Sequence, residues 1–281
     1  MGKYLDPRYV LTFKAVFAEY PDLIISFLNA LLPFKNGEEV LSVEYLPNDL
    51  VENQLGKYTI IDVRCKDNNG RQFLVEMQMY WSDEFKQRVF FNASKAYVKQ
   101  ADKGFHYRDL QPVYSLNLVN DIAFSGEKYY HLFQLAEKGE PDRVIEGIEL
   151  VFVELPKFQS QNKAVKTMMR LWLKFLTEIN EDTTEVPQEL RDNPEISKAI
   201  EILERAAYTE EQLASYEKYW DMVAVNNALY YGRYDAGKED GLKEGLKEGK
   251  METARNLKKL GIPNETISQA TGLTVDEIKM L

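Results

Sequence analysis

Two acidic residues, Asp62 and Glu76, have a spacing that could place two carboxylates side by side. They lie in two β-prone runs, residues 57–65 and 72–80, with a turn-forming Asn-Gly pair between the runs. Asn-Gly between two such runs is a strong signal for a β-hairpin. Like charges that face each other in a hairpin repel unless a cation binds them. Mg²⁺ or Mn²⁺ is the cation that hard oxygen ligands prefer.

The turn decides which residues of this hairpin face each other. If residues 68–70 form the loop, with Gly70 in the left-handed conformation, Asp62 lies directly opposite Glu76. Facing Cβ atoms in such a pair are about 4.5–5.5 Å apart. Gln78 lies two residues beyond Glu76 and therefore shares its face of the strand. The alternative is a solvent-facing polar strip on a half-exposed hairpin.

A basic segment follows the hairpin. Residues 85–108 contain six basic side chains against one acidic side chain, and their spacing predicts an amphipathic helix. The predicted polar face carries Arg88, Asn92, Lys95, Lys99 and Lys103, and the predicted apolar band is Val89, Phe90, Ala93, Ala96, Tyr97 and Ala101. Basic residues beside a carboxylate pair could bind the phosphates of a nucleic acid. The alternative is a solvated lysine face without a ligand.

Composition limits the remaining possibilities. The net charge of −10 argues against nonspecific coating of nucleic acid. The single cysteine, Cys65, excludes an intrachain disulfide, and without a Cys/His cluster a zinc site is not expected. His106 and His131 are isolated and predict surface or packing roles. No membrane span, signal peptide or glycine-rich phosphate loop is recognisable, which predicts a cytoplasmic protein without a nucleotide cofactor.

The order of predicted elements indicates an α/β core followed by helices. A helix is predicted over 13–32 and strands over 41–46, 112–119 and 149–155, besides the hairpin and the basic helix. The near-continuous apolar run at 112–119 is typical of a central strand. Further helices are predicted over 163–179, 192–207 and 210–231.

The C-terminal part has a different composition. Glycines recur every fourth residue from Gly237 to Gly249, and each costs a helix interior about 1 kcal/mol relative to alanine. This tract predicts a linker or a marginal helix, and a glycine seam that pairs two helices in a dimer is the alternative. Three short helices follow, with Asn264 as a predicted cap and a predicted Thr274–Glu277 capping box. Their outline resembles a helix-turn-helix, but a surplus of one positive charge over 250–281 favours assembly over DNA binding.

Several of these segments together carry a family resemblance. They are Phe13-Lys14-Ala-Val-Phe17, Leu28–Leu32, Ile61-Asp62-Val63, Val75-Glu76-Met-Gln78, the Arg88–Tyr97 helix and Pro112-Val-Tyr114. In order and spacing they resemble the Rpn family of recombination-promoting nucleases and transposases, within the PD-(D/E)XK nuclease superfamily. The resemblance covers residues 4–155, and the Gly-Leu-Lys-Glu-Gly tract and closing helices resemble the family's tail.

The resemblance implies a fold, an activity and site residues. The implied fold is a restriction-endonuclease-like α/β core at 1–160, a mixed sheet flanked by helices. It is followed by a helical extension at 161–234, a linker or helix at 235–250 and a helix-turn-helix-like unit at 251–281. The implied activity is Mg²⁺- or Mn²⁺-dependent DNA cleavage in recombination or transposition.

In this resemblance Asp62 and Glu76 match the two acids of the family motif, and Gln78 occupies its lysine position. A glutamine there is common in the family, but it lacks a charge, and Lys14 could supply the missing cation. Val10 stands where the family usually has an aspartate. These departures leave open a catalytically lapsed nuclease fold that acts as an interaction or regulatory protein.

Overall fold

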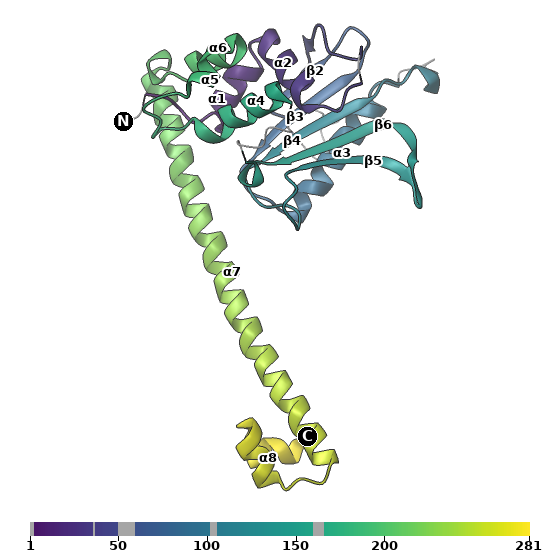
Figure 1. Ribbon diagram of the computed structural model, residues 1–281, viewed down its shortest axis with the longest axis vertical. Helices are drawn as coiled ribbons and strands as arrows, with labels where there is room; N and C mark the ends of the chain where they lie inside the picture. The colour runs from purple at the N-terminus through teal and green to yellow at the C-terminus, as the bar shows by residue number, and fades with distance from the viewer. Residues whose placement is uncertain (1–2, 36, 50–59, 102–105, 160–165) are drawn as a thin grey trace. The chain divides into compact units, whose positions relative to one another are not determined.

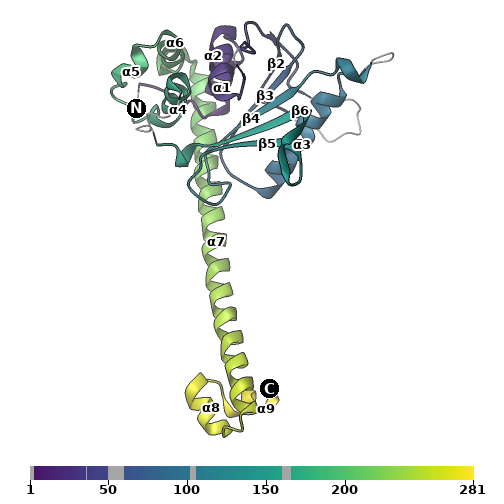
Figure 2. The ribbon, with the colours of Figure 1, turned by 45° about the vertical axis from the view of Figure 1, so that its right-hand side comes forward.

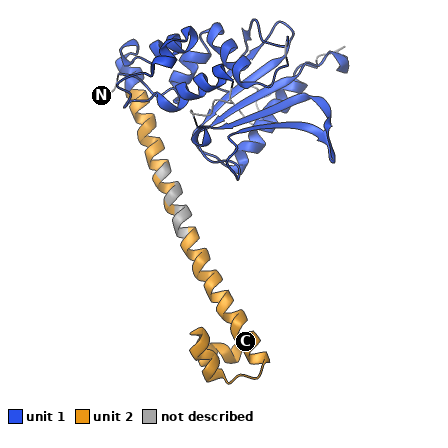
Figure 3. Cartoon of the chain, viewed as in Figure 1, with its two compact units in different colours: residues 1–213 blue, residues 214–281 orange. Residues whose placement is uncertain are grey.

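The protein, a computed structural model, is described at residues 3–35, 37–49, 60–101, 106–159 and 166–281. The chain forms two compact units, residues 1–213 and 214–281, which are coloured separately in Figure 3. No helix in the described part of the chain is both long and apolar enough to cross a membrane.

A six-stranded mixed sheet forms the centre of the first unit, with strand order β1-β2-β3-β4-β6-β5 (Figure 1). The strands are β1 Glu44–Tyr45, β2 Val63–Lys66, β3 Gln72–Gln78, β4 Val113–Val119, β5 Tyr130–Glu137 and β6 Glu140–Glu154. Neighbours β3, β4 and β6 run parallel, and the other pairs are antiparallel. All seven residues of β4 are buried, which confirms the prediction of a central strand.

The hairpin forms with the predicted register. Val63 pairs with Val75, and Lys66 pairs with Gln72, so the position opposite Glu76 is that of Asp62. Gly70 has a φ of 82°, the left-handed conformation that the turn requires. Regular pairing nevertheless begins only at Val63. The predicted start of this strand at residues 57–59 lies outside the described residues.

Helices cover both faces of the sheet (Figures 1 and 2). They are α1 Val10–Phe17, α2 Pro21–Leu31, α3 Asp83–Val98, α4 Thr167–Glu178, α5 Gln188–Arg191 and α6 Pro194–Ile202, with short 3₁₀ turns at Tyr107–Asp109, Leu155–Lys157 and Arg205–Ala207. One face packs against α1, α2, α4 and α6 in the main hydrophobic core, around Trp172 and Phe17. The other face packs against α3, with Trp81 and Phe124 beside it. The predicted α/β core with a mixed sheet flanked by helices is therefore confirmed.

Two predictions about the elements of this unit were wrong. The predicted helix 13–32 is two helices, because Pro21 begins α2 and forces Tyr20 into an extended conformation. The predicted strand 149–155 is the last part of a longer strand, β6, which pairs with β5, a strand that was not predicted. Six of the eight residues of β5 are exposed, so the strand lacks the alternation of polar and apolar residues that marks a half-buried strand.

The second unit contains most of α7, a continuous helix over Glu210–Lys259, followed by α8 Asn264–Thr271 and α9 Val275–Met280. The glycine tract is thus helical, and a Lys243–Glu239 ion pair at 2.7 Å is one contact along it. The Thr274–Glu277 capping box is confirmed. Asn264 is the first residue of α8 and not its cap, because the preceding Pro263 takes the cap position. The small core of this unit is Ala254, Ile267, Leu273 and Ile278.

Candidate active site

A bend in the chain directly before β2 positions Asp62. Ile61 packs on the face that α3 covers, whereas Val63 packs in the core on the other face, so the alternation of a regular strand is interrupted between them. Asp62 lies at this bend, and its Oδ2 accepts a hydrogen bond from the N–H of Met77 at 2.9 Å. The backbone of β3 therefore holds the Asp62 carboxylate beside the position of Glu76.

Glu76 is only 5% exposed, on the sheet face that α3 covers. Its Oε1 accepts a hydrogen bond from Nδ2 of Asn92 at 3.2 Å, and its Oε2 lies 3.5 Å from Nη2 of Arg88. The same Nη2 donates to Oε1 of Gln78 at 2.9 Å. One guanidinium of α3 thus contacts both polar residues near the end of β3.

The two carboxyl groups are incompletely compensated by their surroundings. Burial raises the pKa of Asp62, against the opposing effects of the Met77 N–H, Lys14 and Arg88. Burial also raises the pKa of Glu76, which Arg88 and Asn92 lower, while the negative charge of Asp62 raises it further. The effect of the Asp62 charge on the pKa of Glu76 places the two acids close enough to interact. Both therefore hold a proton more tightly than in water.

Lys14 approaches from the opposite layer of the fold. It lies on α1, its residue is half-buried, and its positive charge lowers the pKa of Asp62. Arg88 lies on α3, on the other side of the sheet. Asp62 directly precedes β2, and cations from both helical layers, Lys14 and Arg88, act on its carboxylate.

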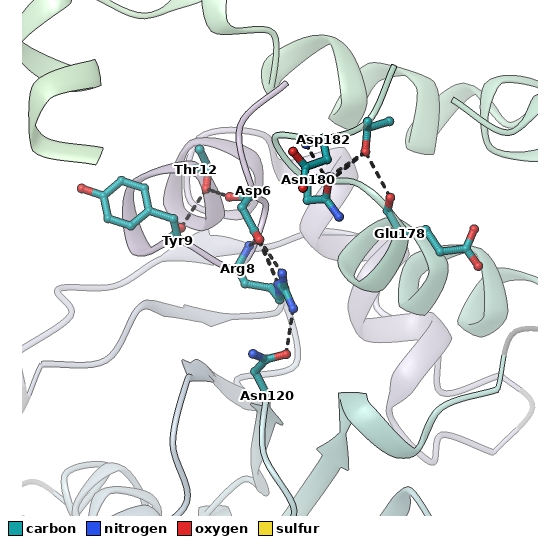
Figure 4. Close-up of polar contacts among 9 residues, drawn as sticks. Asp6, Arg8, Tyr9, Thr12, Asn120, Glu178, Asn180 and Asp182 are labelled. Atoms are coloured by element: carbon teal, nitrogen blue, oxygen red, sulfur yellow. Dashed lines mark hydrogen bonds and ion pairs between the residues drawn. The ribbon is translucent and has the colours of Figure 1, made fainter. Parts of the chain in front are cut away.

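The segment that leads into α1 is tied to the ends of the central strands. Arg8 bonds to the carboxylate of Asp6, and its Nη1 donates to Oδ1 of Asn120 at 2.9 Å (Figure 4). Asn120 directly follows β4, and its N–H donates to the carbonyl of Gln78 at 2.8 Å. These contacts fix the start of the helix that carries Lys14 relative to the strand that carries Glu76.

The predicted basic helix places only part of its charge near the acidic pair. Within the described residues, Arg88 is the member of the predicted basic set that contacts Glu76 and Gln78. Lys95 lies over the ring of Phe91 at 4.8 Å, and Lys99 follows the last residue of α3. Lys103 lies outside the described residues.

Two side chains of α3 were assigned to the wrong face. Phe90 was predicted to be buried and is 55% exposed, whereas Asn92 was predicted to be solvent-facing and is 1% exposed. The buried face follows Val89, Ala93 and Ala96. Asn92 lies three residues after Val89 and four before Ala96, so helical spacing could have placed it on this face.

The donor set fits a hydrated divalent cation. Among the described residues there is no group of three or more His, Cys, Asp or Glu side chains that could hold a metal. Mg²⁺ does not need one, because it commonly binds through one or two carboxylates and keeps several waters. Oδ1 of Asn92 is buried and has no hydrogen-bond partner in the described part of the structure, so it could accept a bond from such a water.

Comparison with known proteins identifies the family. The sequence model of the PD-(D/E)XK nuclease family transposases matches residues 7–228, which is most of the chain. The chain therefore belongs to this family, and the resemblance seen in the sequence is confirmed. Comparison with curated proteins and with solved structures found no match.

Proposed function

We propose that this protein is a Mg²⁺- or Mn²⁺-dependent DNA endonuclease that acts in recombination or transposition in the cytoplasm. The observation that carries the proposal is the pair of half-buried Asp62 and buried Glu76, whose pKa values desolvation raises and whose neighbours compensate them only in part. A buried charge that the protein leaves under-compensated favours binding of a cation. Membership of the nuclease family supports the same conclusion.

In this proposal each residue has a defined task. Asp62 and Glu76 would hold the divalent cation, with Oε1 of Gln78 as a further oxygen donor beside them. Bound there, the cation would polarise the scissile phosphate and favour ionisation of a water molecule. Asn92 would orient water through its free oxygen, and Lys14 would add positive charge from the opposite layer.

DNA would approach along the basic surface of α3. Lys95 and Lys99, together with Lys103 outside the described residues, would contact phosphates that flank the cleaved bond, because lysine binds phosphate largely without regard to sequence. Contacts of this kind would position the DNA without reading its bases.

The C-terminal unit would serve assembly. Gly241, Gly245 and Gly249 have no atom within 4 Å of the place where a Cβ would lie, and Leu242 and Leu246 beside them are exposed. A second copy of α7 could pack closely against this seam. The double variant Leu242→Lys/Leu246→Lys should then sediment as a smaller species than wild type, and an unchanged mass would contradict the assembly role.

A lapsed nuclease is the second candidate. Gln78 stands at the lysine position of the family motif, its Nε2 donates to the Tyr80 carbonyl, and its Oε1 accepts from Arg88. Val10, at the start of the helix that carries Lys14, also lacks the carboxylate that the family usually has there. Such a protein would bind partners or DNA without cutting.

Plasmid cleavage separates the two candidates. Supercoiled DNA is incubated with wild type, Asp62→Asn or Glu76→Gln, with Mg²⁺, Mn²⁺ or EDTA. We expect cleavage by wild type with either metal, and a loss of about a hundredfold or more in both variants, because each removes a ligand. DNA binding by folded wild type without cleavage in either metal would support the lapsed nuclease.

A further inference from the structure

Gln78 leaves the candidate site without a cation at the position where the family motif has a lysine. Arg88 contacts the residue at that position, with Nη2 2.9 Å from Oε1 of Gln78 and 3.5 Å from Oε2 of Glu76. The second distance is long for a charge-assisted hydrogen bond, so this contact can be released at modest cost. Lys14 approaches from the other layer and acts on Asp62.

The surroundings of Arg88 suit a side chain that contacts DNA. Its side chain is 44% exposed, and its guanidinium lies 4.9 Å from the centre of the Phe85 ring. A guanidinium has five N–H donors, and its planar fork matches two oxygens of a phosphate. The Phe85 ring packs against the Arg88 guanidinium, and the exposed part of the Arg88 side chain remains accessible to a substrate.

We propose that Arg88 is the catalytic cation of this site. Its guanidinium contacts the scissile phosphate and supplies the positive charge that the uncharged Gln78 lacks. In the protein without a divalent cation, the same guanidinium compensates Glu76. When a divalent cation binds the carboxylates, Arg88 is released toward the phosphate. This inference rests on the proposed nuclease function. It assigns to Arg88 the positive charge that the candidate site lacks at Gln78.

Arg88 and a divalent cation should therefore compete for Glu76. Replacing Arg88 by glutamine removes the competing charge, so the affinity for Mn²⁺ alone should rise by about three- to tenfold. The same change removes the contact with the phosphate, so plasmid cleavage should fall by about a hundredfold or more. A residue with a purely structural role would not raise metal affinity while activity falls.

The experiment compares Arg88→Gln with Arg88→Lys and with Lys86→Gln as a matched control. Lys86 lies two residues earlier on α3, is exposed and pairs with Asp83 at 3.5 Å, so its replacement makes the same charge change away from the acids. Calorimetric titration with Mn²⁺ gives the affinity, circular dichroism checks folding, and plasmid cleavage gives the rate. Arg88→Lys should bind Mn²⁺ like wild type and recover part of the cleavage, and Lys86→Gln should match wild type in both.

The outcomes separate this inference from the proposed function. If wild type cleaves, and folded Arg88→Gln cleaves within about threefold of it or binds Mn²⁺ less tightly, the role of Arg88 is overturned and the nuclease proposal stands. If wild type neither binds Mn²⁺ nor cleaves, both are overturned. Tighter Mn²⁺ binding together with lost cleavage in Arg88→Gln is the result that supports the inference.

Discussion

Glu76 and Glu154 lie on the same face of one sheet, and both side chains are almost completely buried. Gln78, two residues after Glu76, is in register with Val119 of β4, which is in register with Glu154 at the end of β6. The two glutamates thus lie near the carboxyl ends of parallel strands that are separated only by β4. Their neighbours are very different.

Glu154 is surrounded by donors. Its Oε1 accepts from the N–H groups of Ala123 and Phe124 at 2.6 and 3.1 Å, and its Oε2 lies 2.8 Å from Nε2 of His131 and 2.9 Å from Nζ of Lys157. Burial alone would raise its pKa, but the hydrogen bonds from Lys157, the two amides and His131 hold the pKa below its usual value. The charge of the Glu154 carboxylate is thus fully compensated by its neighbours, as expected for a structural residue.

The Asp62–Glu76 pair has fewer donors for twice the negative charge. Asn92 and Arg88 contact Glu76, the Met77 N–H contacts Asp62, and the pKa of each acid remains raised. Burial of a carboxylate therefore does not by itself mark a functional site. What marks the candidate site is a pair of neighbouring carboxylates, one buried and one half-buried, that the protein does not fully compensate.

The largest expected effect is on Glu154. Glu154→Gln removes the carboxylate that pairs with the ammonium group of Lys157. The Lys157 side chain is only 10% exposed. Breaking a buried ion pair in this way costs about 3 kcal/mol or more of unfolding free energy. Urea denaturation would measure the loss, and a variant as stable as wild type would show that this cluster is no more structural than the candidate site.

A smaller loss is expected at His131. His131→Gln removes one of the four donors of Glu154 and keeps Lys157 and both amides, so the expected cost is about 1 kcal/mol. The same denaturation experiment applies. A loss equal to that of Glu154→Gln would mean that the histidine, and not the lysine, provides most of the compensation.

Replacement of Asp62 should have the opposite sign. Asp62→Asn keeps an oxygen that can accept from the Met77 N–H but removes one of two repelling charges. In the absence of metal, the unfolding free energy should be unchanged or higher by about 1 kcal/mol. Thermal denaturation in EDTA measures it, and a loss of several kcal/mol would identify Asp62 as a structural residue like Glu154.

The pH dependence sharpens the same comparison. Because the folded-state pKa of Asp62 is raised, its charge destabilises the fold at neutral pH, and this cost disappears as pH falls below the folded pKa. The stability advantage of Asp62→Asn over wild type should therefore shrink as the pH falls from neutral through the folded-state pKa of Asp62. For Glu154, whose pKa is lowered, the loss in Glu154→Gln should persist across that range. An advantage of Asp62→Asn that grows on acidification would contradict the assignment.

Much of the core could be predicted from local signals in the sequence. The Asn-Gly turn fixed the hairpin register, and the apolar run of β4 indicated its central place, because both depend on residues near in sequence. The break at Asp62 could not be predicted in this way. It depends on Ile61 and Val63 packing against opposite helical layers, which is a tertiary effect.

The partners of the candidate site were harder to predict than its acids. Asp62, Glu76 and Gln78 lie in or next to one hairpin, so its register predicted that they lie close together. Asn92 was missed because a polar residue on an amphipathic helix is normally expected to face solvent. The donors of Glu154 come from a loop, an unpredicted strand and a 3₁₀ turn, so their convergence follows from the fold and not from spacing.

Metal-dependent stabilisation tests the central claim most directly. Thermal unfolding of wild type, Asp62→Asn and Glu76→Gln is measured with EDTA and with saturating Mn²⁺, and Glu140→Gln, an exposed carboxylate on β6, is the control. Ligand at about a hundred times its dissociation constant stabilises the folded state by about 2.7 kcal/mol. We expect a clear rise in unfolding temperature for wild type and Glu140→Gln, and little or none for the other two variants. An equal rise in all four proteins, or no rise in wild type, would contradict it.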